Sequence, residues 1–251
     1  MARREFPPAL KWIIRVLRPP LMVLTKRDWR GTEHLPDGGF VLVANHISHT
    51  DPVMLGHFLA DQGIPPRYLA KSSLFTLPVF GRLVRAAGQI PVYRDSALAG
   101  EALAAAVSSV QAGQAVIIYP EGTITRDPGL WPMVGRTGAA RVALSTGCPV
   151  IPVAQWGPQE VLAPYARRPH LFPRRTMRVR VGRPVELDDL RERELDASVL
   201  AEASERILAA ISTLLGEIRG ELPPAVRYDA RAHAVVDRRE RDQDDDEARG
   251  A

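Results

Sequence analysis

The chain has 251 residues, of which 45% are hydrophobic and 25% are charged, and its formal net charge is +4. These values predict a globular domain and exclude a disordered or fibrous chain. The single cysteine excludes an internal disulfide, and no apolar run reaches the ~20 residues that a membrane-spanning helix needs. We also expect no secretory signal, because no uninterrupted apolar core follows the basic start.

Residues 1–27 form a basic segment that is rich in apolar side chains. Residues 1–30 carry eight lysines and arginines against two acidic residues, a balance of 8 − 2 = +6. Trp12 and many aliphatic residues are interleaved with these cations, and Pro19-Pro20 interrupts the run. The pattern predicts two short interfacial helices on an anionic membrane surface, with a pair of helices packed on the domain as the alternative. Nucleic acid is not expected as a partner, because no nucleic-acid-binding signature accompanies the basic residues.

Short apolar runs bounded by turn residues predict buried strands. Four such runs occur, at residues 40–44, 68–70, 115–119 and 149–154. Helical stretches at residues 97–111 and 137–146 lie between them, and each ends near a glycine that suits a helix C-terminus. Alternating strands and helices predict a single α/β domain over residues 28–222, with a mostly parallel central sheet flanked by helices.

Two further elements follow these runs. Met177, Val179 and Val181 alternate with arginines, which predicts a strand with one exposed face. Apolar residues between Leu200 and Ile218 have helical spacing, so we expect a helix that packs on the sheet. Residues 223–251 end in a strongly charged run and are expected to form a disordered tail.

His46 is the strongest candidate for a catalytic residue. It follows the apolar run 40–44, and Asp51 lies five positions later, across a turn, where its carboxylate can orient the imidazole. A histidine held in this way is a suitable general base near neutral pH. The chain has no Gly-x-Ser-x-Gly sequence, and Cys148 lies in an apolar stretch. We therefore expect His46 to deprotonate a substrate hydroxyl, as in an acyltransferase.

Two other interpretations of this segment stay open. Ser48 and Asp51 match a capping box, and Pro52 suits the first turn of a helix, so Asp51 could be only a helix-cap residue. His46, His49 and Asp51 could instead be metal ligands. The remaining histidines are scattered along the chain, and we expect no metal site.

Three polar segments are expected at one edge of the sheet. His46 follows one strand, Arg94 follows residues 88–93, and the sequence Tyr-Pro-Glu-Gly-Thr at residues 119–123 follows another strand. In α/β sheets, ligands gather beyond the carboxyl ends of the strands. This convergence favours a functional site over a purely structural interpretation of each segment.

Together these segments resemble the glycerolipid acyltransferase family, which includes 1-acylglycerol-3-phosphate O-acyltransferase. The family sequence Asn-His-x-Ser-x-x-Asp matches residues 45–51, and Gly-x-Ile-x-x-x-Arg matches residues 88–94. Phe/Tyr-Pro-Glu-Gly-Thr matches residues 119–123, and a sequence like Val-Pro-Val-Ile-Pro-Val matches residues 148–153. The four motifs occur in the order of the family, which makes the resemblance specific.

The resemblance implies transfer of a fatty-acyl group from acyl-CoA or acyl carrier protein to the lysophospholipid 1-acylglycerol 3-phosphate, which gives phosphatidic acid. His46 would be the general base and Asp51 would support the imidazolium, with no acyl-enzyme, metal or organic cofactor. Glu121 and Thr123 would shape the acceptor site, and backbone N–H groups near Gly122 would stabilise the oxyanion. Such an enzyme is expected to be a peripheral protein on the cytoplasmic face of the cell membrane.

An acceptor phosphate requires cations, and arginine suits phosphate best. Arg94 is the first candidate, and Lys71 also resembles a phosphate-contacting lysine of the family. The family has an arginine directly after the threonine of its third motif, where this chain has Ile124, and the next arginine is Arg126. Arg136 is a further basic candidate, which could instead mark the start of a helix.

Three other functions stay open at this stage. Ile124 favours a different acceptor, such as another lyso-phospholipid, a glycolipid or an ornithine lipid. If the acceptor pocket admits water, the protein is an acyl-thioester hydrolase. A membrane-bound lipid-binding protein without activity is the third, and the presence of both His46 and Asp51 argues against it.

Overall fold

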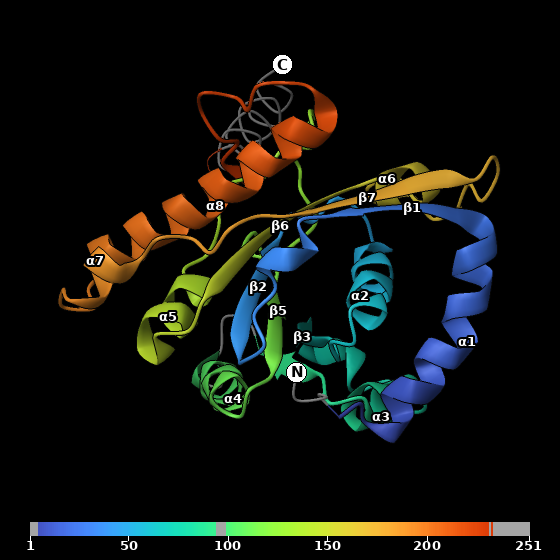
Figure 1. Cartoon of the computed structure of the whole chain (residues 1–251), viewed down its shortest axis with the longest axis horizontal. Coiled ribbons are helices and arrows are strands. Elements are labelled where there is room, and N and C mark those ends of the chain that lie inside the picture. The colour runs from blue at the N-terminus through green and yellow to red at the C-terminus, as the bar shows by residue number, and fades with distance from the viewer. Residues whose placement is uncertain (1–4, 94–98, 231, 233–251) are drawn as a thin grey trace, which may run out of the picture.

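The structure is a computed structural model that describes residues 5–93, 99–230 and 232 (Figure 1). In chain order its elements are α1 (Pro8–Leu24), β1 (Thr25–Arg30), η1 (Thr32–His34), β2 (Phe40–Ala44), α2 (Asp51–Asp61), β3 (Arg67–Lys71), η2 (Ser72–Leu74), α3 (Phe80–Ala86), β4 (Ile90–Val92), α4 (Ala99–Gln111), β5 (Ala115–Ile118), α5 (Gly138–Thr146), β6 (Val150–Trp156), α6 (Pro158–Val161), β7 (Arg175–Val181), α7 (Asp188–Arg191) and α8 (Ala197–Arg219).

The strands of the described chain form a seven-stranded sheet in the order β1-β7-β6-β2-β5-β3-β4. The strands from β6 to β4 pair in parallel. β7 pairs antiparallel with β6 and parallel with β1, so the carboxyl ends of β1 and β7 point to the opposite edge of the sheet. The predicted α/β class with a mostly parallel sheet is confirmed.

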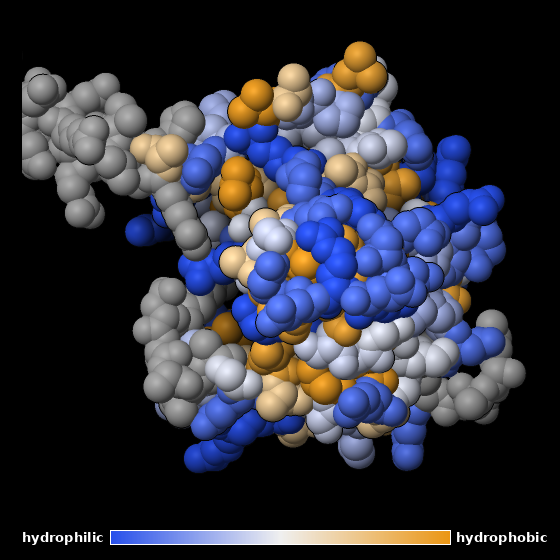
Figure 2. All heavy atoms as spheres, turned by 90° about the vertical axis from the view of Figure 1, so that its left-hand side faces the viewer, coloured by the Kyte–Doolittle hydropathy of each residue, from blue (hydrophilic) through white to orange (hydrophobic). Residues whose placement is uncertain are grey.

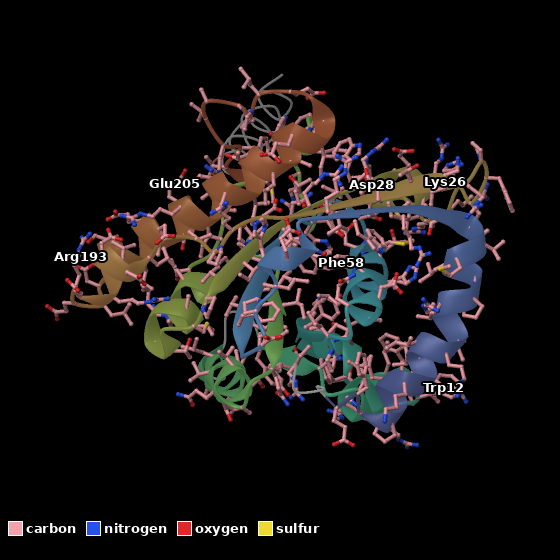
Figure 3. All side chains as sticks on the ribbon, viewed as in Figure 1. Trp12, Lys26, Asp28, Phe58, Arg193 and Glu205 are labelled. Carbon is pink, nitrogen blue, oxygen red and sulfur yellow. The ribbon has the colours of Figure 1, made fainter. Side chains whose placement is uncertain are left out.

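β2 lies inside the sheet, and both of its faces are covered by helices. Phe40 and Leu42 belong to a buried cluster with Phe58 of α2, which lies between that helix and the sheet (Figure 3). Val41 and Val43 belong to a second cluster with residues of α4, α5 and α8 on the other face (Figure 1). Burial on both faces explains why the run is apolar throughout instead of alternating.

The predicted elements correspond to observed ones. The four predicted buried strands are β2, β3, β5 and β6, of which β3 is only partly buried, the predicted half-exposed strand is β7, and the predicted helices are α4, α5 and α8. No apolar run indicated β1, because this edge strand is largely exposed and carries charged residues. α3 has only seven residues, which is too short for a clear helical period.

α1 differs from the predicted pair of short helices, because it is one helix that continues through Pro19 and Pro20. Each proline removes the hydrogen bond to the carbonyl four residues earlier, here those of Arg15 and Val16. All four residues are exposed, so water can satisfy the freed carbonyls and the helix is not broken. None of the helices in the described part of the chain has the length and apolarity that a membrane span requires.

The surface of the molecule is uneven in polarity. The side that bears α5 and α7 is mostly hydrophilic (Figure 2). Exposed large apolar side chains occur on α1 and at residues 77–80, at the other side of the fold: Trp12, Val16, Leu17, Val23, Leu77, Val79 and Phe80. α1 and α3 contact each other, so these side chains belong to one region.

Residues 223–230 lie beyond the domain boundary at 222 that the sequence suggested, yet they contact the domain. The N–H of Val134 donates to the carbonyl of Tyr228 (3.0 Å), and Arg227 pairs with Glu205 of α8 (2.8 Å). The charged remainder of the tail, residues 233–251, lies outside the described residues.

Candidate active site

His46 and Asp51 meet beyond the carboxyl end of β2, where Asp51 begins α2. Nδ1 of His46 lies 2.7 Å from Oδ2 of Asp51, which also accepts the N–H groups of Ile47 (2.6 Å) and Ser48 (2.9 Å). Because a carboxylate oxygen only accepts, the proton belongs on Nδ1, and Nε2 keeps its lone pair. The Asp51 side chain is fully buried, whereas that of His46 is 16% exposed. Burial raises the pKa of Asp51, against the opposing effect of His46 and the two N–H groups.

This arrangement has one half of a capping box, because the Asp51 carboxylate accepts the N–H of Ser48 (2.9 Å), but it lacks the other half. In a capping box, the hydroxyl of Ser48 would accept the N–H of Asp51. Instead, that N–H donates to the Ser48 carbonyl (3.2 Å), and the Ser48 hydroxyl donates to the carbonyl of Leu162 (2.6 Å). The Asp51 carboxylate turns back towards residues 46–48, so its contacts fix the histidine and the turn.

The segment after β5 holds the backbone of His46 from both sides. The N–H of His46 donates to Oε1 of Glu121 (3.1 Å), and its carbonyl accepts the N–H of Thr125 (2.7 Å). Oε2 of Glu121 accepts the N–H of Met133 (3.0 Å). Burial raises the pKa of Glu121 to about 8, although the N–H groups of Met133 and His46 oppose the rise. Glu121 therefore positions His46 and is not among the residues that line the adjacent cavity.

Two more side chains fix the end of β2. The ring of Tyr119 stacks on the His46 imidazole, with centroids 4.3 Å apart and planes 20° apart. Asn45 and Gln155 of β6 share three hydrogen bonds of 2.8 to 3.0 Å, which tie the two strands together directly before His46. Asn45 and Tyr119 belong to recognised motifs, but no sequence signal indicated Gln155, because its contact depends on β2 and β6 being neighbours.

A cavity of about 1440 Å³ lies beside His46. Residues of α1, α2 and α3 and of the segments after β2, β3 and β5 line it. α1 stands apart from the sheet (Figure 1) and lines this cavity together with α2 and α3. It contributes mainly apolar side chains, including Leu10, Ile13, Ile14, Leu17 and Leu21. A cavity with this lining suits a hydrocarbon chain.

The cations that the sequence proposed for the acceptor phosphate differ in their position relative to the cavity. Lys71, at the end of β3, lines the same cavity as His46, and so do Gly122 and Thr123. Arg126 is exposed and does not line the cavity. Arg94 lies outside the described residues.

Arg136 brings a further cation to the cavity. Its N–H donates to the carbonyl of Pro120 (2.8 Å), which holds it against the turn after β5. Gly122 in this turn has a φ of +71°, and a Cβ there would lie 3.2 Å from Cδ and Nε of Arg136. Glycine thus allows both the left-handed backbone and the close approach of the arginine. Arg136 was only a further candidate from the sequence, because its position beside Gly122 depends on the fold.

Asp61, the last residue of α2, fixes α1 against the domain. Its Oδ1 accepts Nε (3.2 Å) and a terminal nitrogen (3.0 Å) of Arg18 from α1. Its Oδ2 accepts Arg27 (2.8 Å) and the indole N–H of Trp29 (3.3 Å) from β1. Burial opposes ionisation of Asp61, but these donors outweigh it and lower its pKa. The carboxylate therefore joins three elements at one wall of the cavity.

A metal centre has no cluster of ligands to support it. Among the described residues, no three side chains of histidine, cysteine, aspartate or glutamate are close enough to share a metal ion. His49 lines the cavity, while His57 is buried in α2 and its pKa is lowered by burial. His46, His49 and Asp51 do not converge on a common point as three ligands would.

Known proteins resemble this chain over about half of its length. A family model described as Acyltransferase matches residues 26–156. The 1-acyl-sn-glycerol-3-phosphate acyltransferase BAT2, chloroplastic, of Brassica napus is 31% identical over 140 residues, which are 55% of this chain and 39% of that protein. The lyso-ornithine lipid O-acyltransferase of Pseudomonas aeruginosa is 36% identical over 115 residues, which are 45% of this chain and 41% of that protein. The chain thus spans about two fifths of the length of these relatives.

A solved structure extends the likeness to most of the fold. The crystal structure of the 1-acyl-sn-glycerophosphate (LPA) acyltransferase PlsC from Thermotoga maritima matches with a TM-score of 0.64 and 22% identity. The match covers 86% of this chain and 83% of that chain. At this identity the likeness establishes a common fold, including regions outside residues 26–156.

Proposed function

The chain belongs to the acyltransferase family, and we propose that it transfers a fatty-acyl group from a thioester to the free hydroxyl of 1-acylglycerol 3-phosphate, giving phosphatidic acid. The observation that carries the proposal is the His46–Asp51 hydrogen bond of 2.7 Å beside a cavity with apolar walls. A base next to a hydrocarbon-sized cavity suits a reaction between two lipids. The donor is acyl-CoA or acyl carrier protein.

In the proposed mechanism, Nε2 of His46 removes the proton of the acceptor hydroxyl, and the oxygen attacks the thioester carbonyl. The tetrahedral intermediate collapses, the carbon–sulfur bond breaks, and the imidazolium returns its proton to the leaving thiolate. Asp51 accepts the Nδ1 hydrogen bond and stabilises the imidazolium between these two steps. The acyl group passes directly to the acceptor, so the protein needs no nucleophile of its own.

The developing oxyanion needs a donor that is not already engaged. Among the backbone N–H groups expected to act near Gly122, that of Gly122 itself is bonded to the carbonyl of Tyr119 at 3.0 Å. Thr123 follows in the same turn, lines the cavity and makes no hydrogen bond with any described residue. Thr123 is therefore the better candidate for oxyanion stabilisation.

Lys71 and Arg136 are the cations that we assign to the acceptor phosphate, because both line the cavity with His46. Arg94 stays a candidate on the strength of its motif. Arg126 is a weaker candidate, since it is exposed and away from the lining.

A different lyso-lipid acceptor is the second candidate function. Ile124 is buried and lines the cavity at the position where the family motif has an arginine. A relative named lyso-ornithine lipid O-acyltransferase shares 36% identity over 115 residues. An acceptor with a headgroup other than phosphate would suit a site that has Ile124 in place of the family's arginine.

Attachment to the cytoplasmic surface of the membrane is part of the proposal. α1 exposes Trp12 and Val23 together with the basic residues Lys11 and Arg15. Apolar and basic side chains on one helix favour an anionic lipid surface. Because the same helix forms a wall of the cavity, a lipid substrate would not need to cross water.

Thiol release tests the proposal directly. We would follow release from oleoyl-CoA with and without 1-acylglycerol 3-phosphate, for the wild type and for His46→Ala. Release that requires both the acceptor and His46 supports the acyltransferase. Acceptor-independent release would instead identify a thioester hydrolase, and a panel that includes lyso-ornithine lipid would separate the two acceptor classes.

A further inference from the structure

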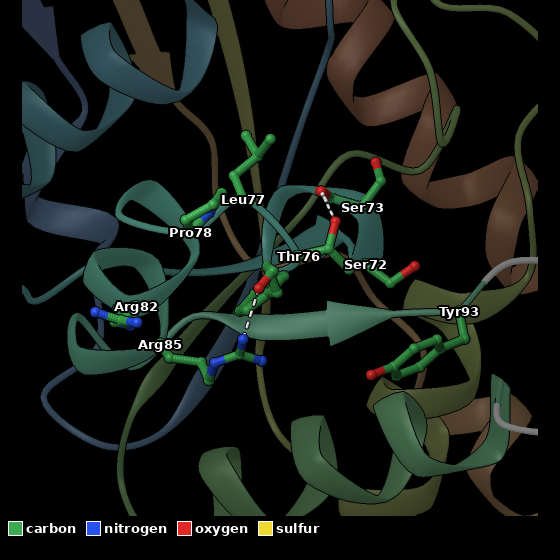
Figure 4. A pocket seen from close by; sticks show the side chains of 9 residues that line it. Ser72, Ser73, Thr76, Leu77, Pro78, Arg82, Arg85 and Tyr93 are labelled. Carbon is green, nitrogen blue, oxygen red and sulfur yellow. Dashed lines mark hydrogen bonds between the residues drawn. The ribbon is translucent and has the colours of Figure 1, made fainter.

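A second hollow, of about 730 Å³, lies where the turn after β3, α3 and the end of β4 meet (Figure 4). Its lining combines hydroxyl, guanidinium and phenol groups: Ser72, Ser73, Thr76, Arg82, Arg85 and Tyr93. No residue in the described lining carries a carboxylate. We call this hollow the α3 groove. Its chemistry suits an anion that also carries hydrogen-bonding groups.

The α3 groove lies in a segment without acidic residues. Residues 62–93 contain Arg67, Lys71, Arg82 and Arg85 and no aspartate or glutamate, so their formal charge is 4 − 0 = +4. Arg82 and Arg85 are three residues apart on α3 and therefore share one face of the helix. This local positive charge has no acidic residue within the segment to neutralise it.

Arg82 and Arg85 differ in whether their guanidinium groups are already bonded to the protein. A terminal nitrogen of Arg85 donates to the backbone carbonyl of Phe75 (2.5 Å) (Figure 4). The guanidinium of Arg85 also lies 5.7 Å from the centre of the Phe75 ring. Arg82 is exposed and makes no hydrogen bond or ion pair with a described residue. Arg85 thus has a fixed position, and Arg82 is available to a ligand.

The α3 groove borders the cavity that contains His46. Tyr93 lines both, and Lys71 of the cavity directly precedes Ser72 of the groove. A thioester donor has an acyl tail, a reactive carbonyl and an arm that carries amide groups and ends in a phosphate. With the tail in the apolar cavity and the carbonyl at His46, the arm must leave the cavity across its rim.

We propose that the α3 groove binds the phosphopantetheine arm of the acyl donor, with Arg82 on the phosphate and the hydroxyls of Ser72, Ser73 and Thr76 near the amides. This arm is common to coenzyme A and acyl carrier protein. The inference rests on the proposed function, because it assumes a thioester donor. The groove is also lined by the apolar residues Phe75, Leu77 and Pro78, which suit the methylene groups of the arm, and a lipid headgroup is the alternative occupant that vesicle binding tests.

Calorimetric titration of the full chain with pantetheine, 4′-phosphopantetheine and coenzyme A tests the groove without catalysis. We expect Arg82→Gln to weaken binding of the two phosphate-bearing ligands roughly tenfold, as the loss of one charge-assisted hydrogen bond predicts, and to leave pantetheine unchanged. Arg183→Gln is the matched control. Arg183 is an exposed arginine after β7, at the opposite edge of the sheet, and its loss should change none of the three affinities.

Kinetic and membrane measurements complete the test. Arg82→Gln should raise KM for acyl-CoA and for acylated acyl carrier protein without changing kcat. Equal affinities of wild type and Arg82→Gln for coenzyme A would refute the groove. If Arg82→Gln loses binding to phosphatidylglycerol vesicles but keeps its affinity for coenzyme A, the proposal is also refuted, and Arg82 is assigned to a lipid headgroup. If coenzyme A binding depends on Arg82 but no acceptor is acylated, the groove stands and the proposed function fails.

Discussion

Asp51→Asn isolates the electrostatic part of the proposed mechanism. The substitution keeps an oxygen that can accept the N–H groups of Ile47 and Ser48, but it removes the negative charge beside His46. At a charge separation of about 4 Å and an effective dielectric constant of about 20, the carboxylate stabilises an imidazolium by about 4 kcal/mol. A loss of that size lowers kcat about 10³-fold. KM should change little, because Asp51 is buried and does not line the cavity.

The assay is thiol release from oleoyl-CoA at saturating acceptor, with circular dichroism melting of each variant to verify folding. Asp28→Asn is the matched control, because Asp28 of β1 is also ion-paired, at 2.9 Å to Arg180, but lies away from the cavity. It should keep the kcat of the wild type. If Asp51→Asn folds and retains more than about a tenth of kcat, the expected stabilisation of roughly 4 kcal/mol is wrong. His46 would then act without electrostatic support.

Three more predictions concern the acceptor, the buried acid and the membrane. Arg136→Gln should raise KM for 1-acylglycerol 3-phosphate roughly tenfold and should affect KM for an uncharged acceptor much less. A tenfold increase in KM with Arg126→Gln, and none with Arg136→Gln, would reverse our assignment of the cation. Folding raises the pKa of Glu121 from 4.5 to about 8, so its stabilising contribution is complete below pH 4.5 and is lost as pH rises through 8. The Tm of Glu121→Gln should therefore fall less between pH 5 and 8 than that of the wild type, and parallel curves would contradict this. Val23→Glu, at an exposed position of α1 that does not line the cavity, should reduce flotation with phosphatidylglycerol vesicles, whereas Leu222→Glu, at an even more exposed apolar site after α8, should not.

α1 packs on the domain, which was one of the two alternatives that the sequence left open, and its contact with a membrane stays a proposal. Some of its apolar residues, such as Leu10 and Leu21, line the cavity, while Val23 is exposed. Arg18 of α1 is exposed and pairs with Asp61 of α2. A deletion of residues 1–27 would therefore remove a cavity wall and part of β1 along with any membrane contact. Single substitutions on the exposed side of α1 give a cleaner test of membrane binding.

The arrangement of His46 and Asp51 could be predicted because it is local. Five positions of chain and one turn bring the two side chains together, and the apolar run before His46 already indicated a strand end. The role of Glu121 could not be predicted in the same way. Its motif indicated importance, but only the parallel pairing of β2 and β5 directs its carboxyl group to the backbone of His46. A carboxylate expected to shape the acceptor site instead positions the proposed base.

Apolar periodicity and short-range spacing encode the α/β class, most of the buried strands and the histidine–aspartate pair, so these could be predicted from the residues alone. Which cations line the cavity depends on the fold. Arg126 is nearer in sequence to Thr123, yet Arg136 is the one held beside Gly122, because its backbone bonds to Pro120 and the left-handed glycine leaves room for its side chain. Contacts between residues far apart in the chain, such as Arg18 with Asp61 and Asn45 with Gln155, depend on the order of strands and helices in space. No local pattern of residues encodes that order.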